Sequence, residues 1–271
     1  MIIGGKDFSR SAHTYIMGIL NVTPDSFSDG GKWNQLDQAF YHVEEMLASG
    51  MDILDIGGES ARPGYTKLSD EEEIARVLPF LEGVKKRFDV PISLDTYKSK
   101  VAEAGIWAGA DLINDIWGLK YDSKMAQVIA ENQVSCCLMH NRVNTEYKSF
   151  LPEVISDLQE SLEIANKAGI EKDRIMLDPG VGFAKSYEQN LQIINNLEEF
   201  TKLGFPVLLG TSRKSVIGLT LDLPVTEREE GTLVTTVMAV EKGCRFVRVH
   251  DVEKTRRAIL MAEAILQSGT V

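Results

Sequence analysis

One phrase recurs along this chain: a segment with helical spacing ends at a glycine, and a few residues later a short apolar run ends in a polar residue. It occurs around Gly50, Gly109, Gly169, Gly204 and Gly243. Glycine suits the left-handed conformation just past a helix end, and apolar runs that scarcely alternate are typical of strands buried on both faces. The repeat therefore predicts a parallel sheet whose strands alternate with helices.

Three further segments have the same character, which brings the number of predicted strands to eight. In chain order the strands lie in YIMGILN, MDILDIGG, VPISLD, ADLINDIWG, VSCCLMH, IEKDRIMLDPG, FPVLLGTSRK and CRFVRVHD. Eight such units match the (β/α)8 TIM barrel, whose active site lies at the carboxyl ends of the strands. A doubly wound open sheet is the alternative, but it gives no reason for all eight strands to finish in polar residues.

The α/β pattern runs through the whole chain without a linker or a low-complexity segment, so residues 1–271 are expected to form a single barrel domain. Two connections are long and polar, residues 22–33 after the first strand and residues 57–69 after the second. Loops of this length inside a compact domain are usually functional or disordered. We expect both loops to border the active site.

Composition excludes several classes of protein. The formal net charge is −11, which disfavours nucleic-acid binding because that affinity comes mainly from Lys and Arg on phosphates. No window approaches the roughly 18 apolar residues of a membrane span, and the start MIIGGKDFSR lacks the apolar core of a signal peptide. Three cysteines without disulfide or zinc spacing suit a reducing compartment. We expect a cytoplasmic protein with no membrane or nucleic-acid partner.

Polar side chains at the strand ends should meet at one mouth of the barrel. They are Asn21, Asp55, Glu59, Asp95, Asn114, Asp115, Met139 (the one apolar member), His140, Asp178, Lys214, Arg248 and His250. Carboxylates, an amide and a lysine complement the edge of a flat, amide-rich heterocycle, and Arg62, Arg248 and His250 could meet a phosphate. For any single residue, helix capping is an equal alternative. For the whole set, buried polar groups without a ligand would be costly.

The long first loop belongs to the segment MGILNVTPDSFSDGG, which resembles the signature of the dihydropteroate synthases. DIGGESARPG, SLDTYKS, INDIWG, LMHNR, LDPGVGFAK, GTSRKS and FVRVHDV follow in the order expected for that family. The resemblance implies an enzyme of folate biosynthesis, a homodimer and a sulfonamide target, that joins 6-hydroxymethyl-7,8-dihydropterin diphosphate to p-aminobenzoate and releases pyrophosphate. It further implies that the C–O bond at the pterin methylene breaks first.

The resemblance also implies roles for individual residues. The pterin would be bound by Asp95, Asn114, Met139, Asp178, Phe183, Lys214 and Arg248, of which Asp95, Asp178, Lys214 and Arg248 would be catalytic. The diphosphate would be bound by Asn21, Arg62, Arg248 and His250, with Mg²⁺ held through Asn21. The p-aminobenzoate pocket would use Phe27, Pro63, Phe183 and Ser215.

Other functions stay open at this point. A pterin-binding methyltransferase would share the barrel, a Schiff-base aldolase could use Lys214, and a noncatalytic module would keep only the pterin site. The sequence also departs from the family pattern ESTRPG, because Ala61 stands in place of the threonine. A threonine hydroxyl there could hydrogen-bond the departing pyrophosphate, so one contact is expected to be absent.

Overall fold

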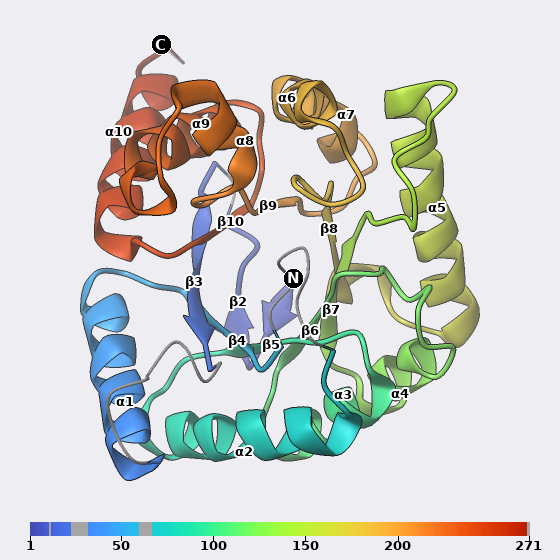
Figure 1. Cartoon of the computed structure of the whole chain (residues 1–271), viewed down its shortest axis with the longest axis vertical. Coiled ribbons are helices and arrows are strands. Elements are labelled where there is room, and N and C mark those ends of the chain that lie inside the picture. The colour runs from blue at the N-terminus through green and yellow to red at the C-terminus, as the bar shows by residue number, and fades with distance from the viewer. Residues whose placement is uncertain (11, 23–31, 60–66, 270–271) are drawn as a thin grey trace.

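Eight parallel strands form a closed barrel at the centre of the molecule (Figure 1). The computed structural model describes residues 1–10, 12–22, 32–59 and 67–269. The barrel strands are β3 (Tyr15–Asn21), β4 (Ile53–Gly57), β5 (Ile92–Asp95), β6 (Leu112–Asp115), β7 (Ser135–Met139), β8 (Ile175–Asp178), β9 (Leu208–Leu209) and β10 (Phe246–Val249). Each contains one of the apolar runs, so the predicted strands are confirmed.

The ladder of paired strands runs β8-β7-β6-β5-β4-β3-β10-β9. A parallel bridge between Leu177 and Val207 joins its two ends, and the Leu177 N–H donates to the Pro206 carbonyl at 2.9 Å. The sheet is therefore a (β/α)8 TIM barrel, as predicted, and the open-sheet alternative is wrong.

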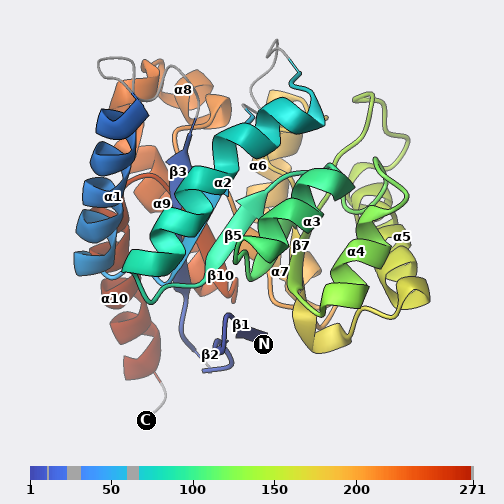
Figure 2. The same ribbon diagram turned by 90° about the horizontal axis from the view of Figure 1, so that it is seen from below.

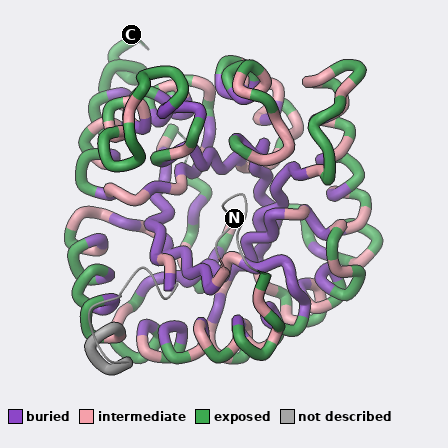
Figure 3. The backbone as a smooth tube through the Cα atoms, viewed as in Figure 1, coloured by how far each residue is buried: buried purple, intermediate pink, exposed green. Residues whose placement is uncertain are grey.

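Helices surround the barrel (Figures 1 and 2). They are α1 (Lys32–Ala48), α2 (Asp70–Arg87), α3 (Ser99–Trp107), α4 (Met125–Asn132), α5 (Phe150–Ala168), α6 (Tyr187–Asn195), α7 (Leu197–Thr201), α8 (Ser215–Leu221), α9 (Glu229–Glu241) and α10 (Val252–Ser268), with short 3₁₀ turns at Lys172–Arg174 and Val225–Glu227. Figure 3 shows that burial is concentrated in the strands and the inward sides of the helices. Within the described ranges, no helix has the length and apolar character needed to cross a membrane.

The glycines that follow the helices have the backbone conformation that the sequence predicts. Their φ angles are positive: Gly50 93°, Gly109 109°, Gly169 86°, Gly204 77° and Gly243 78°. Gly169 shows the role most directly, because it caps α5 and its N–H donates to carbonyls of the last turn. Each such turn redirects the chain from a helix into the next strand.

The long connections follow β3 and β4, where the sequence places them. β3 ends at Asn21 and α1 begins at Lys32, whereas β4 ends at Gly57 and α2 begins at Asp70. Ser69 caps α2 through its side chain, which accepts from the N–H of Glu72. Residues 23–31 and 60–66 of these connections lie outside the described residues.

A hairpin at the amino terminus closes the lower end of the barrel, which the sequence analysis does not anticipate. β1 (Ile2–Ile3) and β2 (Lys6–Asp7) are antiparallel and lie at the end opposite α8 (Figure 2). Ile3 and Phe8 are buried among the side chains inside the barrel, and the Phe8 ring contacts the ring of Tyr15 at 4.9 Å between centroids. Ligands can therefore reach the interior only from the carboxyl ends of the strands.

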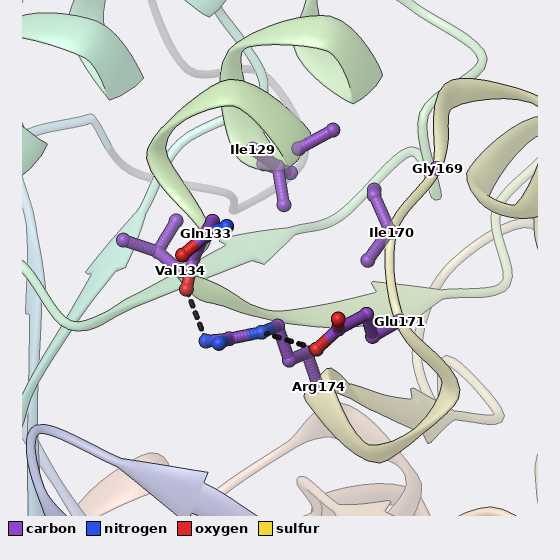
Figure 4. A pocket seen from close by; sticks show the side chains of 8 residues that line it. Ile129, Gln133, Val134, Gly169, Ile170, Glu171 and Arg174 are labelled. Atoms are coloured by element: carbon purple, nitrogen blue, oxygen red, sulfur yellow. Dashed lines mark hydrogen bonds and ion pairs between the residues drawn. The ribbon is translucent and has the colours of Figure 1, made fainter.

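A small cavity lies at the same lower end, between the end of α4 and the segment that leads into β8 (Figure 4). Arg174 points across it, donates to the Gln133 carbonyl and pairs with Glu171 at 3.2 Å. The polar groups of the cavity thus bind one another and hold the end of α4 to the segment before β8. We therefore assign this cavity a structural role.

Candidate active site

Arg248 links three strands at the upper end of the barrel. It is on β10, and its Nε donates to Asp55 Oδ2 on β4 at 2.7 Å, whereas its Nη2 donates to Asp95 Oδ2 on β5 at 2.8 Å. The other oxygen of Asp55 accepts from the Ser93 hydroxyl at 2.6 Å. The guanidinium group is thereby fixed in one orientation above the interior of the barrel.

Asp178 and Lys214 both lie close to Gly210. One oxygen of Asp178, Oδ1, accepts from the N–H of Gly180 at 2.7 Å. A Cβ atom placed on Gly210 would lie 3.7 Å from both Asp178 Oδ2 and Lys214 Nζ. A longer side chain at this position would crowd the carboxylate and the amine, so glycine keeps both groups accessible to a ligand with donor and acceptor atoms on one edge.

Apolar side chains form a wall next to these polar groups. Tyr97, Ile116 and Met139 are buried together, and Trp117 and Phe183 pack against them. The amine of Lys214 lies 4.9 Å from the centre of the Phe183 ring. The site thus combines flat apolar surfaces with a polar edge, which is the arrangement that binds an aromatic heterocycle.

Burial shifts the pKa values of the charged groups. It raises the pKa of Asp95 to about 7, because nearby Asp55 adds to the desolvation cost and Arg248 offsets only part of it. Burial also raises the pKa of Asp178 and lowers that of Lys214 to about 8. Burial by itself would lower the pKa of Arg248, but Asp55 and Asp95 raise it overall.

Three carboxyl groups in this cluster face two cationic side chains. Asp55 and Asp95 contact Arg248, and the charge of Asp178 acts on Lys214. Among these five groups the ionised carboxylates exceed the cations by one, and the charge of Lys185, which also acts on Asp178, offsets part of that excess. A ligand that presents several N–H groups, or that develops positive charge, would be stabilised there.

The remaining predicted residues lie around this cluster. Asn114 is buried and is the register partner of Asp95. A Cβ atom on Gly57 would lie 3.8 Å from Asn21 Oδ1 and 3.7 Å from Asp95 Oδ2, so both side chains are near Gly57.

The outer predicted residues lie farther along the upper loops. His250 Nδ1 is 2.9 Å from the hydroxyl of Ser212, and Ser215 is exposed at the first residue of α8. Phe27, Arg62 and Pro63 lie outside the described residues, as does Ala61.

Two of the strand-end residues have partners outside the site. Asp115 accepts hydrogen bonds from the N–H groups of Trp117 and Leu119, at 2.8 and 2.7 Å, and so holds the turn after β6; it does not cap α4, which begins at Met125. The side chain of His140 is buried, with Nε2 3.0 Å from Asp157. Neither residue faces a ligand, because local partners use the polar atoms of its side chain.

Asp55, predicted at the mouth without a role of its own, holds Arg248. The signal was an aspartate inside an otherwise apolar strand, ILDIG. Such a residue needs a buried partner, but the sequence does not reveal which cation from another strand supplies it.

The comparisons with known proteins agree with this geometry. The sequence pattern of the family described as pterin binding enzymes matches residues 17–250. The barrel and its site are thus those of a pterin-binding enzyme. The dihydropteroate synthase of Clostridium beijerinckii is 58% identical over 268 residues, 98% of this chain and 100% of that protein. That of Bacillus subtilis is 54% identical over 97% of this chain and 92% of its own length.

Solved structures give the same result. A dihydropteroate synthase from Clostridium difficile, crystallised in the presence of pteroic acid, superposes with a TM-score of 0.93 at 47% identity, over 96% of this chain and 99% of that chain. One from Xanthomonas albilineans with 4-aminobenzoic acid has a TM-score of 0.89 at 39% identity, over 94% and 93%. The chain belongs to the dihydropteroate synthase family.

Replacing Asp178 tests the polar edge of the site. In Asp178→Asn the amide oxygen can still accept from Gly180, but the NH2 group then faces the donors of a ligand. We expect pterin affinity to fall by about 2 to 3 kcal/mol, the range for a charge-assisted pair, when measured by calorimetry. Asp173→Asn, at an exposed position, is the control and should bind normally. An unchanged affinity in the first variant would remove Asp178 from the site.

The raised pKa of Asp95 predicts a pH dependence of stability. Its carboxyl group ionises near pH 4 in the unfolded chain but at about 7 when folded. Between these values the folded protein keeps a proton that the unfolded chain has lost, so this group makes stability fall as pH rises. Urea unfolding should therefore show that the free energy of unfolding of Asp95→Asn rises relative to that of the wild-type protein between pH 5 and pH 8. If the difference between the two proteins does not change with pH, the pKa of Asp95 is not raised.

Proposed function

We propose that the enzyme condenses 6-hydroxymethyl-7,8-dihydropterin diphosphate with p-aminobenzoate to give 7,8-dihydropteroate and pyrophosphate, as a step of folate biosynthesis. The observation that carries the proposal is the placement of Asp178, Lys214 and Arg248 together around Gly210, with Asp95 paired to Arg248. Relatives crystallised with pteroic acid and with 4-aminobenzoic acid support it.

In this proposal the pterin lies flat against the apolar wall with its polar edge toward the carboxylates. Asp178 accepts from the ring N–H and the exocyclic amine, and Lys214 donates to the ring oxygen. Asn114 and Asp95 complete the edge, and Arg248 stacks over the ring. Matched donors and acceptors of this kind select the pterin over heterocycles with other edge patterns.

The excess negative charge of the site suits a dissociative displacement. The C–O bond to the diphosphate breaks first, and the electron pair leaves with pyrophosphate. The positive charge left on the methylene carbon is spread into the ring, where Asp95 and Asp178 stabilise it. The neutral amine of p-aminobenzoate then forms the C–N bond and loses its proton to solvent. No strong base is needed, and the protein's main task is to position the two substrates.

We propose that Asn21, Arg62, Arg248 and His250 bind the diphosphate together with Mg²⁺. The donor set near Asn21 fits this ion, because the amide oxygen of Asn21 and the carboxylate of Asp95 both lie beside Gly57 and Mg²⁺ prefers few protein oxygens plus phosphate and water. Among the described residues no cluster of His, Cys, Asp and Glu could hold a metal by itself, so binding would depend on the substrate. When bound, the ion would neutralise charge on the leaving group.

Pyrophosphate release tests the proposal against the alternatives. We expect release that requires both substrates and stops when EDTA removes Mg²⁺. A methyltransferase, a noncatalytic module or a Schiff-base aldolase at Lys214 would release no pyrophosphate under these conditions. Absence of release from protein that binds pterin would therefore reject the synthase reaction.

The anion role of His250 has its own test. We expect His250→Ala to weaken binding of the diphosphate substrate about tenfold, the loss of one contact to a charged group, and to leave binding of the free hydroxymethyl pterin nearly unchanged. His42→Ala, at an exposed position on α1, is the matched control. Equal losses for both ligands would exclude a role in binding the diphosphate.

We also propose that the enzyme is a homodimer. The exposed side of α9 carries Val234 and Val237, whereas its buried side carries Ala239 and Val240 together with three threonines, Thr232, Thr235 and Thr236. Exposed apolar residues continue onto the neighbouring helices: Leu219 and Leu221 on α8, and Leu260, Met261 and Ile265 on α10. Exposed apolar side chains on three neighbouring helices indicate an interaction surface, and a second copy of the same surface would cover it.

Light scattering after gel filtration should give twice the chain mass of 30.1 kDa. We expect Val234→Glu to give the single-chain mass, because a carboxylate in the apolar interface would be buried without a partner. Trp107→Glu replaces an apolar residue of α3 that is 75% exposed and should stay dimeric. A wild-type protein of single-chain mass would overturn the proposal.

We infer a cytoplasmic location for this enzyme. Cys136, Cys137 and Cys244 are free thiols inside the protein, which suits a reducing compartment. Its partners in this proposal are the two small substrates and the second subunit.

A further inference from the structure

The turn that follows β8, residues 180–185, is held by side chains on both of its sides. Lys214 Nζ donates to the carbonyl of Val181 at 2.5 Å on the side of the active site. On the opposite side, Lys185 Nζ donates to the carbonyls of Gly180 and Phe183 at 2.9 and 3.0 Å. Two lysines thus bind carbonyl groups of one short turn.

The amine of Lys185 is itself fixed by a chain of hydrogen-bonded side chains. It lies 2.8 Å from His140 Nδ1. Burial and the nearby Lys185 lower the pKa of His140 to about 3, so the ring is neutral, and Nδ1 accepts from the amine while Nε2 donates to Asp157 at 3.0 Å. Arg142 in turn donates to both oxygens of Asp157. Lys185 therefore has one position, set by α5 and the end of β7.

The turn has no room to adjust between these supports. A Cβ atom on Gly180 would lie 2.0 Å from the carbonyl oxygen of His140, and one on Gly182 would lie 3.2 Å from Cδ of Lys214. Both glycines have positive φ angles, 71° and 87°. A shift of the turn would therefore move directly into Lys214 on one side or into β7 on the other.

The turn carries three parts of the ligand site. Its Gly180 N–H donates to Asp178 Oδ1, its Val181 carbonyl accepts from Lys214, and its Phe183 ring lies over the Lys214 amine. The hydrogen bonds of Lys185 go to the carbonyls of the turn and to His140, and its charge also acts on Asp178. Lys185 therefore influences the ligand site through the turn and through the carboxylate that the turn positions.

We propose that Lys185 is a positioning residue for pterin binding, which it controls by fixing the turn that orients Asp178, Lys214 and Phe183. The role rests on the proposed function only in that the ligand is a pterin. It adds to the site residues that the strand-end pattern does not include, and it gives the hydrogen-bonded pair of His140 and Asp157 a function.

Lys185→Met tests the proposal, because methionine keeps an unbranched apolar stem of similar reach and removes every N–H donor. We expect calorimetry to show about tenfold weaker binding of free 6-hydroxymethylpterin, equivalent to 1.4 kcal/mol. In turnover, the KM for the pterin diphosphate should rise while kcat changes little. The reason is that the variant weakens binding of the pterin ring equally in the ground state and in the transition state. Lys185→Gln keeps one short donor and should give a smaller loss.

Two controls separate positioning from general stability. Val154→Ala removes buried methyl groups from α5 and no hydrogen-bonding group, and should lower the melting temperature while pterin affinity stays normal. Lys202→Met removes an exposed lysine that pairs with Glu199 and should change neither quantity. Normal pterin affinity in Lys185→Met, or an equal loss in Val154→Ala, would overturn the proposal. If the wild-type protein bound no pterin, the proposed function would fail instead.

Discussion

The contact of Arg248 with Asp55 and Asp95 is the interaction on which the upper end of the barrel depends. It joins side chains from β10, β4 and β5, which the closure of the barrel brings together. Buried ion pairs contribute little net stability, because desolvation of the charges offsets their attraction. Their value here is orientation: the pair fixes a carboxylate and a flat guanidinium group above the interior of the barrel.

Closure also creates the electrostatic conditions of the site. Ile3 and Phe8, in and just after the amino-terminal hairpin, fill the lower end of the barrel. The charged groups at the upper end therefore lie above an apolar interior. Desolvation there raises the pKa of Asp95 and lowers that of Lys214. A binding edge with an excess of negative charge is costly when empty, and a ligand rich in N–H groups relieves that cost. Affinity and the stabilisation of positive charge thus have one physical source.

Hydrogen bonds between residues outside the ligand site also help to position its side chains. His140 and Asp157 are polar groups that the ligand cannot reach, and their hydrogen bonds lead through Lys185 to the turn beside Lys214. Hydrogen-bonded chains of this kind hold side chains within the narrow tolerance that binding requires. The buried face of α9 acts similarly, since Thr235 and Thr232 contact Thr211 and the N–H of Arg213 in the loop before Lys214.

The sequence by itself determined the fold and placed a set of polar residues at the carboxyl ends of the strands. Apolar runs and the glycines after the helices are local signals, because backbone conformation and burial depend on the residue and its near neighbours. The strand-end positions of Asp95, Asn114, Asp178, Lys214 and Arg248 follow from the same pattern. The tertiary structure alone decided which charges pair, that Asp115 and His140 have partners outside the site, and that Lys185 supports the turn. Those outcomes depend on distances between side chains far apart along the chain, such as Arg248 and Asp55, and a local pattern contains no information about such distances.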